Sequence, residues 1–72
     1  PETQAADRQH LSLLQTQIQR LPDKLKTALL LFAIEGHSQE ECAAILGVTP
    51  KTVELRVYRA RKLLLERLPK FL

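Results

Sequence analysis

The sequence predicts an all-α domain made of four helices and no strands, on three observations. The 72 residues include only two glycines and three aromatic residues, a composition that favours helices over strands and turns. Leucine and isoleucine recur at spacings of three and four, which is the period of an amphipathic helix. Prolines and glycines separate the apolar runs at positions that suit helix ends. A chain of this length forms one small domain, too small for a deep catalytic cleft.

The first helix is expected over about residues 5–20. Its apolar side consists of Leu11, Leu14, Ile18 and Leu21. Pro22 interrupts this pattern and suits the first position of a second helix, where a missing N–H has no consequence. The inner side of that second helix consists of Leu25, Ala28, Leu29 and Phe32. Because the run Ala28–Ile34 is apolar on most sides, this helix is predicted to be the central one. Gly36 is expected to end it in the left-handed conformation.

A short third helix is predicted over residues 39–46. Ser38 and Glu41 have the spacing of a capping box, in which each side chain satisfies a backbone N–H at the start of a helix. Gly47 supplies the positive φ of a sharp turn, and Val48 can fill the corner that follows.

A fourth helix is predicted from Pro50 to about Arg67, with Thr49 as its N-cap. Its buried side is expected to consist of Val53, Val57, Ala60 and Leu64. Ala43 is small enough for the third helix to cross this side closely. Residues 38–64 therefore have the outline of a helix-turn-helix, in a domain of winged-helix size without strands.

Positive charge is concentrated in the C-terminal half of the chain. Residues 1–36 carry no net charge, whereas residues 37–72 carry the whole surplus of +3. The predicted fourth helix holds Lys51, Arg56, Arg59, Arg61 and Lys62. A basic surface of this kind attracts polyanions, so a nucleic acid is the expected partner, with a solvated basic helix as the alternative.

The rotation of 100° per residue divides the fourth helix into sides. With the valines inward, the side chains expected to point outward toward a major groove are Glu54, Leu55, Tyr58 and Arg59. A carboxylate there can accept from cytosine and an apolar side chain can contact the thymine methyl group, so Glu54 and Leu55 are the predicted specificity residues. The side chains expected to contact phosphates are Lys51, Thr52, Arg56, Arg61 and Lys62.

Several short motifs together resemble region 4 of the extracytoplasmic-function (ECF) sigma factors, over about residues 11–68. They are Leu21-Pro22 followed by Lys24 or Lys26, Glu35-Gly36 with Ser38, Ala43, Leu46-Gly47, Thr52-Val53 and Arg56-Val57-Tyr58-Arg59-Ala60-Arg61. The resemblance implies a four-helix domain that recognises the minus-35 promoter element and docks on the β flap of RNA polymerase, with an anti-sigma factor as a further possible partner. Many members carry Lys or Arg and then a small polar residue where this chain has Glu54 and Leu55, so the promoter sequence does not follow.

The resemblance also implies that the chain is a fragment, because the family's promoter-melting region lies upstream. The domain is expected over residues 11–68, with a linker and helix start at 1–10 and a tail at 69–72. The resemblance implies a bacterial protein. A cytoplasmic location is expected, since the longest apolar run is seven residues and the single Cys42 excludes an internal disulfide.

No catalytic constellation, cofactor or metal site is expected. His10 and His37 are interpreted as surface or packing residues, and Cys42 as a small buried hydrophobic residue. Two other functions stay open: a protein-interaction bundle that binds an anti-sigma or adaptor protein, and the effector domain of a response regulator. The C-terminal apolar residues Leu63, Leu64, Leu65, Leu68, Phe71 and Leu72 are expected either to close the bundle or to form a partner surface.

Overall fold

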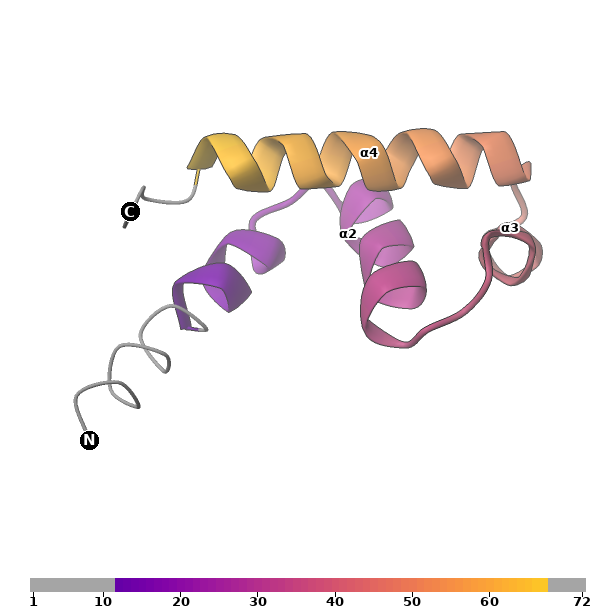
Figure 1. Cartoon of the computed structure of the whole chain (residues 1–72), viewed down its shortest axis with the longest axis horizontal. Helices are drawn as coiled ribbons and strands as arrows, with labels where there is room; N and C mark the ends of the chain where they lie inside the picture. The colour runs from indigo at the N-terminus through magenta and orange to yellow at the C-terminus, as the bar shows by residue number, and fades with distance from the viewer. Residues whose placement is uncertain (1–11, 68–72) are drawn as a thin grey trace.

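A computed structural model of the protein describes residues 12–67 (Figure 1). An N-terminal helix covers residues 12–19 of this range, and it is followed by α2 (Asp23–Leu29), the π-helical η1 (Leu30–Ile34), α3 (Gln39–Leu46) and α4 (Pro50–Arg67). Because η1 continues α2 without a break, residues 12–67 form four helices and contain no strand. This confirms the predicted all-α class. The predicted helix start near residue 5 and the apolar residues Leu11, Leu68, Phe71 and Leu72 lie outside the described range, as does His10.

The long helix α4 organises the domain. In Figure 1 it lies along one edge, with α2 and the N-terminal helix beneath it and α3 seen end-on near its beginning. It contacts both α2 and α3. The predicted second helix, α2 with η1, contacts α4 and α3 and lies between the N-terminal helix and α3 in Figure 1, although Ile34 at its C-terminal end is 65% exposed. α4 buries one side along its length, so it can cover several helices at once.

The core lies between α4 and the helices beneath it. Its buried members are Ile18, Leu21, Ala28, Leu29, Cys42, Ala43, Val53, Val57, Ala60 and Leu64. The predicted inner side of α4 is therefore confirmed, as is the burial of Ala43 at the crossing of α3 and α4. Of the C-terminal leucines within the described range, Leu64 is buried and Leu63 packs against the core, whereas Leu65 is 76% exposed.

The π-helical turn η1 was not predicted. Its hydrogen bonds span five residues, as in the contact of 2.9 Å from the Glu35 N–H to the Leu30 carbonyl oxygen. Side chains that follow such a wide turn are shifted around the helix axis relative to an α-helix. Accordingly Phe32, predicted to share the inner side with Ala28 and Leu29, is only half-buried. Gly36 ends the segment at φ +78°, as predicted.

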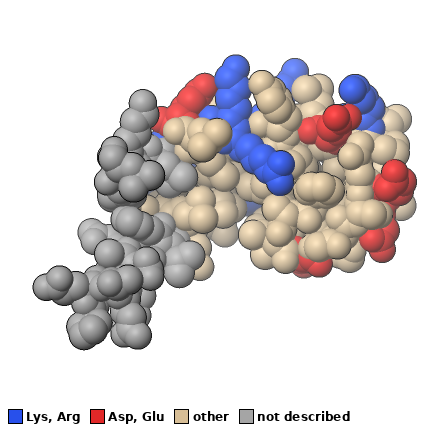
Figure 2. All heavy atoms as spheres, viewed as in Figure 1, with Lys and Arg blue, Asp and Glu red and all other residues tan. Residues whose placement is uncertain are grey.

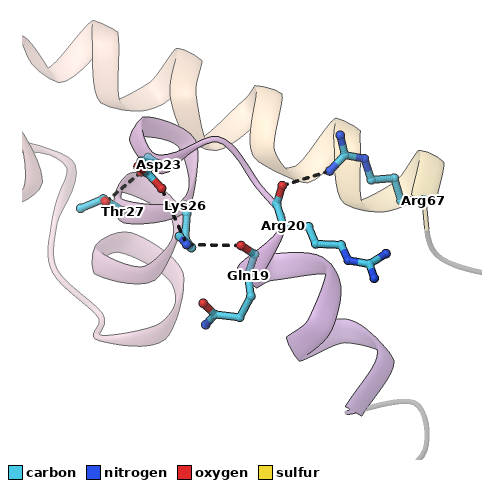
Figure 3. Close-up of polar contacts among 6 residues, drawn as sticks. All are labelled: Gln19, Arg20, Asp23, Lys26, Thr27 and Arg67. Carbon is cyan, nitrogen blue, oxygen red and sulfur yellow. Dashed lines mark hydrogen bonds and ion pairs between the residues drawn. The ribbon is translucent and has the colours of Figure 1, made fainter.

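Two cationic side chains hold the end of the N-terminal helix (Figure 3). The Lys26 ammonium donates to the Gln19 carbonyl oxygen at 3.3 Å, and the Arg67 guanidinium donates to the Arg20 carbonyl oxygen at 3.5 Å. Positive charge is favourable there, because the last carbonyls of a helix carry its negative dipole end. Pro22 precedes α2 rather than beginning it, since its ψ of 141° is extended and not helical.

The start of α3 and the turn between α3 and α4 both have the predicted local structure. Ser38 accepts from the Glu41 N–H at 3.0 Å and Glu41 accepts from the Ser38 N–H at 2.8 Å, which completes the capping box. Gly47 adopts φ +68°, and Thr49 caps α4 by accepting from the Thr52 N–H at 3.1 Å. Val48 packs against the core.

The capping box makes a first prediction. Ser38→Ala removes the hydroxyl that accepts from the Glu41 N–H but keeps the Ser38 N–H, and it is expected to lower the free energy of unfolding by about 1 kcal/mol at pH 7. The hydrogen bonds from Ser38 also hold the pKa of Glu41 below its ordinary value. Because the pKa is depressed in the folded state, this stabilisation is present at neutral pH and is lost as the pH falls below about 4.

Urea unfolding at pH 7 and pH 3 measures both effects. Ser38→Ala should be less stable than the wild type at both pH values, whereas Glu41→Gln, which removes the titrating carboxylate, should be less stable at pH 7 and should match the wild type at pH 3. Glu40→Gln is the matched control, since Glu40 is an exposed acidic residue of the same helical turn. A stability difference between wild type and Glu41→Gln that is equal at both pH values would contradict the assignment.

Candidate nucleic-acid interface

The rotation of α4 about its axis leaves one long side of the helix exposed. Val53 and Ala60 have no exposed surface and Val57 is 5% exposed, so these residues face the core. The predicted outward residues, Glu54, Leu55, Tyr58 and Arg59, are all exposed. Leu55 and Tyr58 are 44% and 63% exposed, although apolar and aromatic side chains are commonly buried. The predicted phase of the helix is therefore confirmed.

Two lysines lie toward the two ends of this exposed side. Lys51 has a side chain that is 87% exposed near the start of α4, and Lys62 is exposed three turns further along. Thr52 is half-buried, and its hydroxyl lies 2.9 Å from the hydroxyl of Thr49. Of the predicted phosphate contacts, Thr52 is thus the residue already engaged in capping its own helix.

Arg56 and Arg61 lie on opposite flanks of α4. Arg56 is half-buried and lines a depression with Lys24 of α2 and Val48 of the turn. Arg61 lies on the other flank, where it lines a groove of about 260 Å³ together with Phe32 and Tyr58. The two arginines were predicted as one set, but the packing of α2 and η1 against α4 separates them.

Glu54 has a partner on its own helix. Its carboxylate lies 3.4 Å from the Lys51 ammonium, one turn earlier, and the two side chains are 57% and 87% exposed. An exposed pair at this spacing contributes little to stability, so either side chain can exchange its partner for another at small cost. The outer side of α4 therefore presents a carboxylate and an ammonium that are loosely paired with each other.

The charge distribution agrees with this description. Figure 2 shows Lys and Arg side chains protruding along the edge that α4 occupies, with acidic side chains near both ends of that edge and over α3. On the face that Figure 2 shows, much of the positive charge therefore lies along the edge that α4 occupies, where it can attract a polyanion.

Three residues near this interface were not predicted. Gln39 donates from its side-chain amide to the Pro50 carbonyl oxygen at 2.8 Å, which ties the start of α3 to the start of α4. Lys24 lines the same depression as Arg56, and the ring of Phe32 lies under the guanidinium of Arg61. A periodic pattern within one helix carries no signal for such contacts, because each of them joins two different elements.

Two further titratable residues, Cys42 and His37, lie outside α4. Cys42 is fully buried, as predicted, and burial raises the pKa of its thiol. His37 is half-buried, with its ring nitrogen 3.6 Å from the Glu35 carboxylate. Within residues 12–67 no three His, Cys, Asp or Glu side chains are grouped so that they could hold a metal ion. No helix in the described part of the chain is both long and apolar enough to cross a membrane.

Comparison with known proteins gives a consistent result. Residues 11–64 match the family described as sigma-70, region 4. The chain is 41% identical over 61 residues to RNA polymerase sigma factor CnrH of Cupriavidus metallidurans, an alignment that covers 85% of this chain and 32% of that protein.

Two further relatives are similar over shorter alignments. Identity is 42% over 57 residues to the ECF RNA polymerase sigma factor SigE of Mycolicibacterium smegmatis, covering 79% of this chain and 22% of that protein. It is 43% over 47 residues to the ECF RNA polymerase sigma-E factor of Haemophilus influenzae, covering 65% and 25%. The chain thus spans about a third or less of the length of these relatives.

Proposed function

Because this chain belongs to the sigma-70 region 4 family, we propose that it is the DNA-binding domain of an ECF sigma factor and recognises the minus-35 element of promoters. In this proposal α4 enters the major groove, with Glu54 and Leu55 against base edges and the cations of α4 against phosphates. Other surfaces of the domain contact RNA polymerase. The family supports DNA binding in general, and the choice of α4 rests on the exposed side described above.

The observation that carries the proposal is the composition of that exposed side. Leu55 and Tyr58 are exposed between charged residues, so they do not form the continuous apolar patch that is typical of a protein-binding surface. A helix with cations along its edges and a few short or flat side chains between them is suited to base edges at its centre and phosphates at its margins.

A single helix in one major groove gives a weak contact. Tethering the domain to RNA polymerase and to a second DNA-binding region of the same sigma factor raises its effective concentration at the promoter, so the weak contact is sufficient. Three exposed apolar side chains that are not assigned to DNA contact, Ile34, Ile45 and Leu65, support protein contacts with polymerase or with an anti-sigma factor.

Glu54 provides the test of sequence recognition. Selection of bound duplexes from a random pool is expected to recover a short sequence in which one position is cytosine, since the Glu54 carboxylate accepts from the cytosine amino group. In Glu54→Gln an amide replaces the carboxylate, and glutamine pairs with adenine, so preference at that one position should move toward adenine by about 1–3 kcal/mol. Release of Lys51 should also raise the affinity for all duplexes.

Glu66→Gln is the control for this experiment, because Glu66 is an exposed acidic residue near the other end of α4. It should change overall affinity without changing the selected sequence. If wild type and Glu54→Gln select the same sequence, Glu54 does not face the bases. If the wild type selects none and its affinity does not depend on salt concentration, the proposed DNA-binding function is wrong.

A further inference from the structure

The guanidinium of Arg61 lies over the ring of Phe32, with its central carbon 6.0 Å from the ring centroid. Phe32 belongs to η1 and packs against the core, so its ring is held in place. Within residues 12–67 the ion pairs involve Lys26, His37 and Lys51, and none includes Arg61. The aromatic ring is therefore the side-chain partner that the described structure gives to this arginine.

This pair lies at the margin of the exposed side of α4. Phe32 and Arg61 line the same groove as Glu54 and Tyr58, two of the outward residues. A cation–π contact with the face of the ring uses none of the hydrogen-bond donors of the guanidinium, so its N–H groups stay available. Arg61 remains exposed, so those N–H groups face solvent beside the proposed DNA-binding side.

The π-helical turn accounts for the position of the ring. Ala28 and Leu29, on the preceding turn, are buried, whereas Phe32 is only half-buried. The wider turn shifts Phe32 around the helix axis, so part of its ring reaches the surface where α4 passes. π-helical turns are often found at functional sites, which agrees with a functional role for this segment.

We infer that Phe32 is a positioning residue for DNA binding, which holds Arg61 extended along the groove so that the edge of its guanidinium meets a phosphate of the duplex. A free arginine side chain samples many rotamers, and most of them would not reach that phosphate. The ring removes much of this freedom before the duplex arrives. This inference rests on the proposed function, because it assumes that the exposed side of α4 binds DNA.

A double-mutant cycle in fluorescence anisotropy titrations tests the inference. Arg61→Ala is expected to weaken binding and to reduce the slope of log K against log salt by about 0.9, the loss of one phosphate contact. Phe32→Leu keeps an apolar side chain but removes the aromatic face, and it should weaken binding about two- to fivefold without changing the slope. In the Arg61→Ala background Phe32→Leu should have no further effect.

Two conservative variants separate positioning from a general loss of structure. Phe32→Tyr retains the aromatic face and should keep wild-type affinity. Arg61→Lys keeps the charge without the planar group and leaves the packing of Phe32 untouched. It should weaken binding by the same factor as Phe32→Leu. If Phe32→Leu does not fold, the affinity of Arg61→Lys tests the positioning role in its place. Leu31→Val, a neighbouring change in η1 outside the groove, is the control and should leave affinity unchanged.

Three outcomes would overturn the inference: an equal effect of Phe32→Leu in the Arg61→Ala background, wild-type affinity of both Phe32→Leu and Arg61→Lys, or an unchanged salt slope in Arg61→Ala. Each of these leaves wild-type DNA binding intact. Failure of the wild type to bind any duplex would instead contradict the proposed function itself.

Discussion

Val53→Asp is expected to unfold the domain. Val53 is among the largest side chains without any exposed surface, and it lies where α4 crosses the helices beneath it. A carboxylate at this position would be buried without a partner, which should lower the free energy of unfolding by about 4 kcal/mol or more. A small domain has in total only roughly 5 kcal/mol of stability, so this loss is close to complete.

Leu55→Asp is the matched control, because it introduces the same charge two residues further along the same helix. Leu55 is 44% exposed, so the stability should change by no more than about 1 kcal/mol. Circular dichroism during urea and thermal unfolding measures both variants. If Leu55→Asp unfolds the domain and Val53→Asp does not, α4 has the opposite rotation and the proposed DNA-binding side is wrong.

The second large effect concerns the cations that frame the exposed side of α4. In the triple variant Lys51→Gln, Arg61→Gln and Lys62→Gln, the proposed phosphate contacts lose their charge while the side chains keep comparable length. A salt slope of about 0.9 per contact corresponds to about eightfold in affinity between 0.1 M and 1 M salt, so three contacts amount to roughly 500-fold at 0.1 M. The slope itself should fall by about 2.7.

Anisotropy titration at several salt concentrations measures both quantities, and the difference from wild type should become small near 1 M salt. Arg20→Gln serves as the control, because Arg20 is an exposed cation at the end of the N-terminal helix and not on α4. An affinity loss of the same size in Arg20→Gln would indicate attraction by net charge alone. An unchanged slope in the triple variant would show that DNA does not meet this side of α4.

The local features of the helix-turn-helix could be predicted because each depends on residues within one helical turn. The capping box needs only Ser38 and Glu41 at the right spacing, and the turn needs a residue that tolerates positive φ, which Gly47 supplies. The phase of α4 is determined by which residues repeat at three and four along one helix. For the same reason, the exposure of Glu54, Leu55, Tyr58 and Arg59 followed from the positions of the valines.

The pattern within one helix did not determine how that helix meets its neighbours. Arg56 and Arg61 had the same predicted role. Arg56 lines a depression with Lys24, whereas Arg61 lies over Phe32, because α2 and η1 pack along different flanks of α4. Similarly, the pairing of Glu54 with Lys51 is one of several rotamers that an exposed carboxylate can adopt.

The sequence by itself determined that this protein is an all-α domain with a helix-turn-helix, where its third and fourth helices begin, and which side of the last helix is exposed. Only the tertiary structure decided that α4 contacts both α2 and α3, that residues 30–34 form a π-helical turn, and that the ring of Phe32 lies under the guanidinium of Arg61. The physical reason is the range of the interactions. Caps, turns and periodicity act within a few residues, whereas the π-helical turn and the contact between Phe32 and Arg61 exist only when separate helices pack together.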